Sequence, residues 1–70
     1  MTKQEALEAL RATAFAVLDT VKESPEGAPA GPMFLAFQAH GLSLETFEAI
    51  TGALVSAGKI KRLGDVFYPV

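Results

Sequence analysis

The segment from Ser24 to Gly31, SPEGAPAG, constrains the fold of this chain more than any other stretch. It contains two prolines and two glycines in eight residues. Proline fixes φ and removes a backbone donor, and glycine favours turns, so a continuous helix does not run through this segment. We therefore expect one element before residues 24–31 and the others after it. Whether a short third strand forms within 24–31 is left open.

A long helix is predicted before the break, over about residues 3–23. Thr2 and Glu5 have the spacing of a capping box at its start. Apolar residues then recur at helical intervals and form one stripe, which we expect to face the core: Leu7, Leu10, Ala14, Val17, Leu18 and Val21. Phe15 falls at the edge of the stripe, where we favour an extension of the core over a contact with another chain.

A second helix is predicted over about residues 32–40. Pro32 suits a first helical position, and Gly41 suits the left-handed residue that follows a helix. The interior, PMFLAFQAH, is apolar around most of its circumference, which is more apolar surface than one small core needs. With the aromatic of the first helix, it supplies the candidate contacts for a partner: Phe15, Met33, Phe34, Leu35 and Phe37.

A third helix is predicted over about residues 44–57. Ser43 suits its N-cap, Leu42 and Phe47 have the spacing of a hydrophobic staple, and Gly58 suits its end. The face opposite its apolar stripe carries two carboxylates and no cation, and we expect it to be exposed: Glu45, Glu48, Ala49, Gly52 and Ser56.

A β-hairpin is predicted over about residues 59–70, where KIKRL and VFYPV flank Gly64 and Asp65. Pairing outward from this turn places Leu63 opposite Val66, Arg62 opposite Phe67 and Lys61 opposite Tyr68, with Ile60 and Phe67 facing inward. Residues 59–70 carry three basic and one acidic side chain, whereas residues 1–58 carry three basic and seven acidic ones. We favour the interpretation that these charges form a solvated edge that protects the strand from aggregation. The alternative is a contact with nucleic acid, for which the candidate residues are Lys59, Lys61, Arg62 and Tyr68.

The order of these elements resembles the winged-helix family, a helix-turn-helix variant with a β-hairpin wing. The stretch GLSLETFEAITGALVSAGKIKRLGDVFYPV is similar to the recognition helix and wing of that family. The resemblance implies a single domain over residues 1–70, mainly α with a C-terminal β-hairpin and therefore α+β in class. It also implies that the third helix and the wing contact nucleic acid.

The charges of the third helix oppose that function. Lys and Arg supply most of the affinity of a protein for DNA, and the predicted exposed face offers only Glu45 and Glu48. We therefore expect a small winged-helix-like interaction module that forms a homodimer or binds a protein partner. The alternative is a DNA-binding regulator that contacts the DNA backbone through its basic wing.

No catalytic residues are predicted, since no carboxylate pair lies near a nucleophile and the glycines do not form a phosphate loop. Without cysteine, the sole histidine, His40, has too few co-ligands for a metal site, and a capping contact at its helix end explains it. We expect no enzyme activity, no cofactor and no small-molecule substrate. The sequence has no apolar run of membrane-spanning length and no signal peptide, and we expect a cytoplasmic protein without membrane contact.

Overall fold

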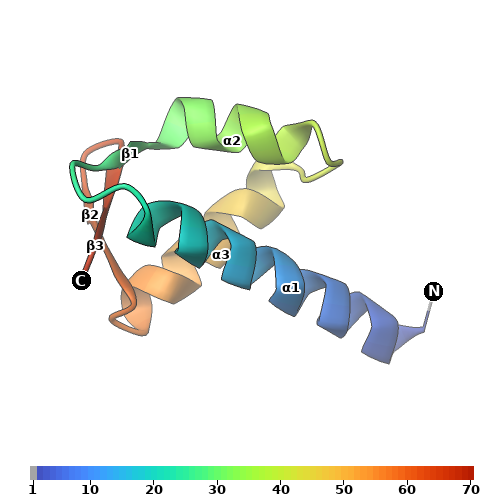
Figure 1. Ribbon diagram of the computed structural model, residues 1–70. Helices are drawn as coiled ribbons and strands as arrows, with labels where there is room; N and C mark the ends of the chain where they lie inside the picture. Colours follow the sequence, from blue (N-terminus) through green and yellow to red (C-terminus); the bar gives the residue numbers. More distant parts are fainter. Residues whose placement is uncertain (1) are drawn as a thin grey trace.

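The computed structural model describes residues 2–70, which form three helices and a three-stranded antiparallel sheet (Figure 1). The elements in chain order are α1 (Lys3–Lys22), β1 (Ala28–Pro29), α2 (Ala30–Gln38), α3 (Leu44–Ser56), β2 (Ile60–Leu63) and β3 (Val66–Pro69). The predicted class, mainly α with a C-terminal hairpin and α+β overall, is confirmed. The arrangement is compatible with a winged-helix-like fold.

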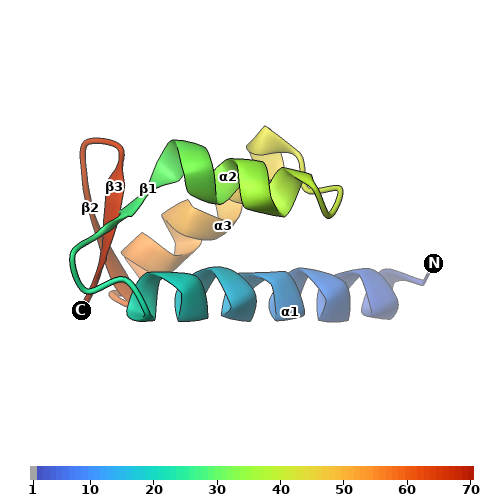
Figure 2. The ribbon, with the colours of Figure 1, turned by 45° about the horizontal axis from the view of Figure 1, so that its top comes forward.

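Helix α1 begins as the sequence indicates. The Thr2 hydroxyl accepts a hydrogen bond from the Glu5 backbone N–H at 3.1 Å and donates one to Glu5 Oε1 at 3.1 Å. The helix then runs along one side of the molecule, and its N-terminal end projects beyond the other elements (Figure 2). Its buried residues, Val17, Leu18 and Val21, all lie in the C-terminal half, and the helix packs mainly against α3 and β3.

The sheet has the strand order β1-β3-β2. The predicted hairpin register is confirmed, since Leu63 pairs with Val66, Arg62 with Phe67 and Lys61 with Tyr68. Gly64 has φ +60°, as expected for a primed turn that starts with glycine.

The open question of a third strand is answered by the two residues of β1. Ala28 lies opposite Phe67, and Pro29 lies opposite Val66 at the edge of the sheet, where proline is tolerated. Gly27 allows the chain to turn close to β3, so that β1 can pair with it. It has φ +108°, and a Cβ built on it would lie 2.6 Å from Val66 Cγ1, so a larger residue does not fit between the turn and the sheet.

Helix α2 begins two residues before the expected position. Pro29 has an extended conformation at the N-cap, and the Ala30 N–H donates to the Asp65 carbonyl at 2.7 Å. Pro32 is therefore the third residue of α2 instead of the first. It still lies within the first turn, where backbone N–H groups have no partner inside the helix, so the missing N–H of proline breaks no helical bond.

The ends of α2 and α3 share one geometry. Gly41 and Gly58 have φ of +90° and +73°, as predicted for left-handed residues. Each glycine N–H bonds a carbonyl three residues back, and the next N–H bonds a carbonyl five residues back. This is the Schellman motif, which satisfies carbonyls that the helix itself leaves without partners. The two glycines therefore set where the helices end.

Phe47 of α3 lies at the centre of the core. Its ring centroid is 5.5 Å from that of Phe34, 6.3 Å from that of Phe37 and 6.4 Å from that of Phe67, so α2, α3 and β3 meet there. The buried apolar residues are Val17, Leu18, Val21, Ala28, Met33, Phe47, Ile50, Ile60 and Phe67. All three helices and all three strands contribute to this core.

Candidate interaction surfaces

The N-terminal half of α1 forms an exposed arm, which we define as residues 3–12. All of its residues are exposed, including Leu7 at 53% and Leu10 at 43%. The prediction that Leu7 and Leu10 belong to the core is therefore wrong. The buried residues of α1 are Val17, Leu18 and Val21, so the body covers the C-terminal part of this helix of 20 residues and leaves residues 3–12 in solvent.

A groove lies where the arm joins the body, between α1 and α3. It has a volume of about 470 Å³, and we call it the α1–α3 groove. Its lining is mostly apolar, and the residues that define it are Leu10, Ala14, Glu45, Thr46, Ala49 and Ala53. The alanines leave room between the two helices, and Glu45 is the sole charged residue among those that line it. The groove can therefore accept an apolar side chain that ends in a positive charge.

The five candidate partner contacts have different environments. Met33 is 5% exposed and belongs to the core, so it stabilises the fold and offers no surface to a partner. Phe34 and Phe37 are half-buried against Phe47.

Leu35 lies on the side of α2 that faces away from Phe37, and it is 63% exposed. Phe15 is 60% exposed, so the expectation that it extends the core is wrong. These two residues stay available for contact with another chain. The surface that sequence reasoning missed is the arm, because an apolar stripe has the same spacing whether or not the chain itself covers it.

The solvent face of α3 has the expected composition. Glu45, Glu48, Ala49, Gly52 and Ser56 are all exposed. Within residues 2–70 the ion pair that forms is Arg62 with Asp65, so no cation neutralises the two glutamates of α3. This face is negatively charged.

The cationic residues of the hairpin are divided between its two faces. Arg62 Nε donates to the Gly64 carbonyl at 2.8 Å, and its guanidinium lies 5.1 Å from the centroid of the Phe67 ring on the inner face. Arg62 also lies 3.5 Å from Asp65. Lys61 pairs with Tyr68 on the other face of the hairpin. Arg62 therefore holds the turn and does not form one continuous basic surface with Lys61.

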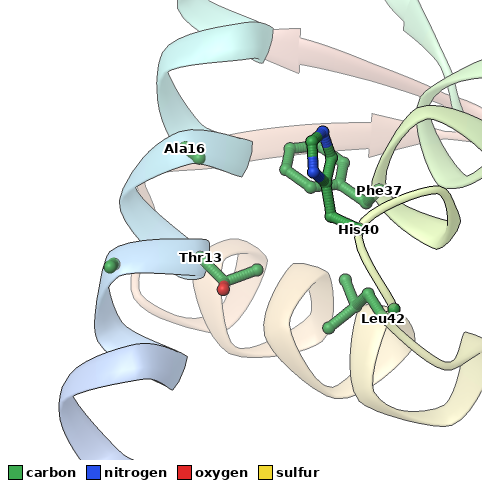
Figure 3. A pocket seen from close by; sticks show the side chains of 7 residues that line it. Thr13, Ala16, Phe37, His40 and Leu42 are labelled. Carbon is green, nitrogen blue, oxygen red and sulfur yellow. The ribbon is translucent and has the colours of Figure 1, made fainter.

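A second pocket, of about 400 Å³, lies between α1 and the end of α2. Figure 3 shows Phe37, His40 and Leu42 projecting from the α2 side toward the α1 face that carries Thr13 and Ala16. The Thr13 hydroxyl donates to the Ala9 carbonyl at 2.9 Å, and His40 is exposed. Across residues 2–70, no three His, Cys, Asp or Glu side chains lie close enough together to hold a metal ion. The pocket offers apolar contact and one imidazole.

Comparisons with protein-family models, with curated proteins and with solved structures found no match. The resemblance to the winged-helix family thus depends on the element order and on the three helices and three-stranded sheet. None of the helices in residues 2–70 combines the length and the apolar character needed to cross a membrane.

Proposed function

We propose that this chain is a small non-enzymatic, winged-helix-like interaction module that self-associates through the arm of α1 and binds a protein partner. The observation that carries the proposal is the exposure of Leu7 and Leu10. They lie on the same face of α1 as Val17 and Val21, which are buried in the core. Leucine at such positions gains free energy when a second polypeptide covers it. Phe15 and Leu35, exposed at 60% and 63%, are the contacts left for a further partner.

The accessible surface supports self-association. The chain exposes 4820 Å², whereas a folded monomer of 7.4 kDa is expected to expose about 4,200 Å². The excess of roughly 600 Å² approaches the 800 Å² that each partner buries in a standard specific interface. A domain of 70 residues buries only about 60% of the surface of its unfolded chain, a smaller share than larger domains bury, so covering the arm would add stability.

The charge of α3 argues against the DNA-binding mode that the family resemblance implies. In that mode α3 would enter the major groove, and its solvent face presents Glu45 and Glu48 without a cation. Uncompensated carboxylates would face the phosphates and lower the affinity. Another polypeptide imposes no such repulsion.

The DNA-binding alternative is favoured by one observation. Lys59 and Lys61 are exposed, and neither forms an ion pair within residues 2–70. Tyr68 lies opposite Lys61 on the same face of the hairpin. A dimer would present this small basic surface twice, enough for weak contact with a phosphate backbone.

Self-association is tested by sedimentation equilibrium at micromolar concentration. The wild-type chain is expected to have twice the mass of one chain, and Leu7→Asp is expected to be a monomer with unchanged helix content by circular dichroism, because Leu7 is outside the core. Leu63→Asp is the matched control, since Leu63 is 70% exposed but lies on the hairpin, and it should leave the dimer intact. A monomeric wild-type chain would contradict the proposal.

Fluorescence anisotropy with mixed-sequence duplex DNA at low salt tests the alternative. We expect no binding at tens of micromolar protein. Binding that weakens with added salt and with Lys61→Ala would instead favour the DNA-binding regulator.

A further inference from the structure

We propose that the arm of each copy lies antiparallel in the α1–α3 groove of a second copy, with Lys3 of one copy beside Glu45 of the other. The inference depends on the self-association proposed above and adds its geometry. Three features of the molecule support it: the spacing of the α1 stripe, the position of the body relative to the arm, and the charges at the groove.

The stripe on α1 has the spacing of a coiled-coil seam. Five of the stripe residues, with Lys3 one interval before them, follow one another at alternating intervals of four and three residues: Lys3, Leu7, Leu10, Ala14, Val17 and Val21. Such a seam packs against a second helix along its whole length. Val17 and Val21 are fully buried by the chain itself, but Leu7 and Leu10 are not. The uncovered part of the seam therefore has the right pattern for a copy of itself.

The position of the body selects the antiparallel orientation. The body packs on one side of α1 and buries Val17, Leu18 and Val21, and the N-terminal end of the helix projects from one end of the molecule (Figure 2). If two arms ran parallel, both bodies would occupy the same end of the helix pair and would compete for that space. In the antiparallel pair, the bodies lie at opposite ends, and the free end of each arm points toward the groove of the other copy. The helix dipoles are also opposed in this arrangement.

The seam sets the register. Placing Leu7 of one copy opposite Leu10 of the other pairs the exposed leucines and brings Lys3 level with Ala14 of the second copy. Ala14 and Glu45 line the same groove. The apolar stem of Lys3 can then lie along the seam while its ammonium group reaches the Glu45 carboxylate. Two-fold symmetry produces this pair twice.

A charge exchange tests the register by sedimentation equilibrium. Lys3→Glu and Glu45→Lys are each expected to raise the dimer dissociation constant by roughly tenfold at low salt, because two attractions become two repulsions. The double variant should return to within about threefold of wild type. Glu48→Lys is the matched control, since it makes the same charge change on α3 at a residue that does not line the α1–α3 groove, and it should have little effect.

The outcomes separate the inference from the proposed function. If the single variants left the dimer dissociation constant unchanged, or if the double variant did not restore it, this geometry would be overturned and self-association would still stand. A monomeric wild-type chain would overturn both.

The orientation has its own test, because the chain lacks cysteine. In the antiparallel pair the two residues at position 3 lie about 16 Å apart along the axis, beyond the roughly 7 Å that a disulfide spans. Lys3→Cys alone should therefore not form a cross-linked dimer under oxidation, whereas Lys3→Cys combined with Ala14→Cys should. Efficient cross-linking of Lys3→Cys alone would show parallel arms.

Discussion

The two halves of α1 have the same apolar spacing and opposite environments. In the C-terminal half, Val17 and Val21 are fully buried and Leu18 is 9% exposed. In the N-terminal half, Leu7 and Leu10 keep about half of their surface in water. One half therefore stabilises the fold, and the other is available to a second chain. An amphipathic stripe indicates that a helix face is to be covered, but it does not say which chain covers it.

The largest expected contrast comes from the same substitution in each half. Leu18→Ala should lower the free energy of unfolding by about 2 to 5 kcal/mol, because it removes a buried side chain and leaves a cavity. Leu10→Ala should cost roughly 1 kcal/mol or less in the dilute monomer, because much of that side chain is already in water. Chemical denaturation at submicromolar and at high micromolar concentration measures both. If Leu10→Ala were as costly as Leu18→Ala in the dilute protein, the two halves would not differ as described.

A smaller effect is expected at the turn that brings the chain from the buried half of α1 back to the sheet. Gly27→Ala should destabilise the fold by about 1 to 3 kcal/mol from backbone strain, and by more where the new Cβ meets Val66 and Tyr68. Gly52→Ala is the matched control. A Cβ there meets nothing within 4 Å, and alanine in place of a helical glycine should stabilise by about 0.5 to 1 kcal/mol. Thermal unfolding of both variants should therefore show shifts of opposite sign.

The smallest expected effect compares two N-caps. The Ser43 and Thr2 hydroxyls each accept a backbone N–H bond at 3.1 Å. Ser43→Ala should cost about 1 kcal/mol of global stability, because α3 packs in the core. Thr2→Ala should change global stability less and instead fray the arm, which would weaken the dimer. Hydrogen exchange over residues 3–12 would detect that fraying. Equal losses in the free energy of unfolding from both variants would contradict the interpretation that the arm does not pack on the body.

Much of the fold could be predicted because its determinants are local. The caps at Thr2 and Ser43, the positive φ of Gly41 and Gly58, and the hairpin register all depend on a few neighbouring residues. The exposure of Glu45 and Glu48 likewise follows from the helical period.

Residues whose environment depends on distant parts of the chain were harder to predict. Helix α2 is apolar on most sides, so its period did not separate the buried Met33 from the exposed Leu35. The strand β1 contains a proline and spans two residues, and it forms because β3 is already in place to pair with it. The early start of α2 depends on the bond from Ala30 to Asp65, which joins residues far apart in sequence.

The sequence by itself determined the order of the helices and the hairpin, the caps of α1 and α3 and the register of the hairpin, because backbone conformation and side-chain period are set within a few residues. Only the tertiary structure decided how far the body extends along α1, and therefore that Leu7 and Leu10 are exposed while Val17 and Val21 are buried. The reason is geometric. A turn of the helix is buried only where another element of the fold reaches it. The spacing of apolar residues along α1 carries no information on how far the other elements extend.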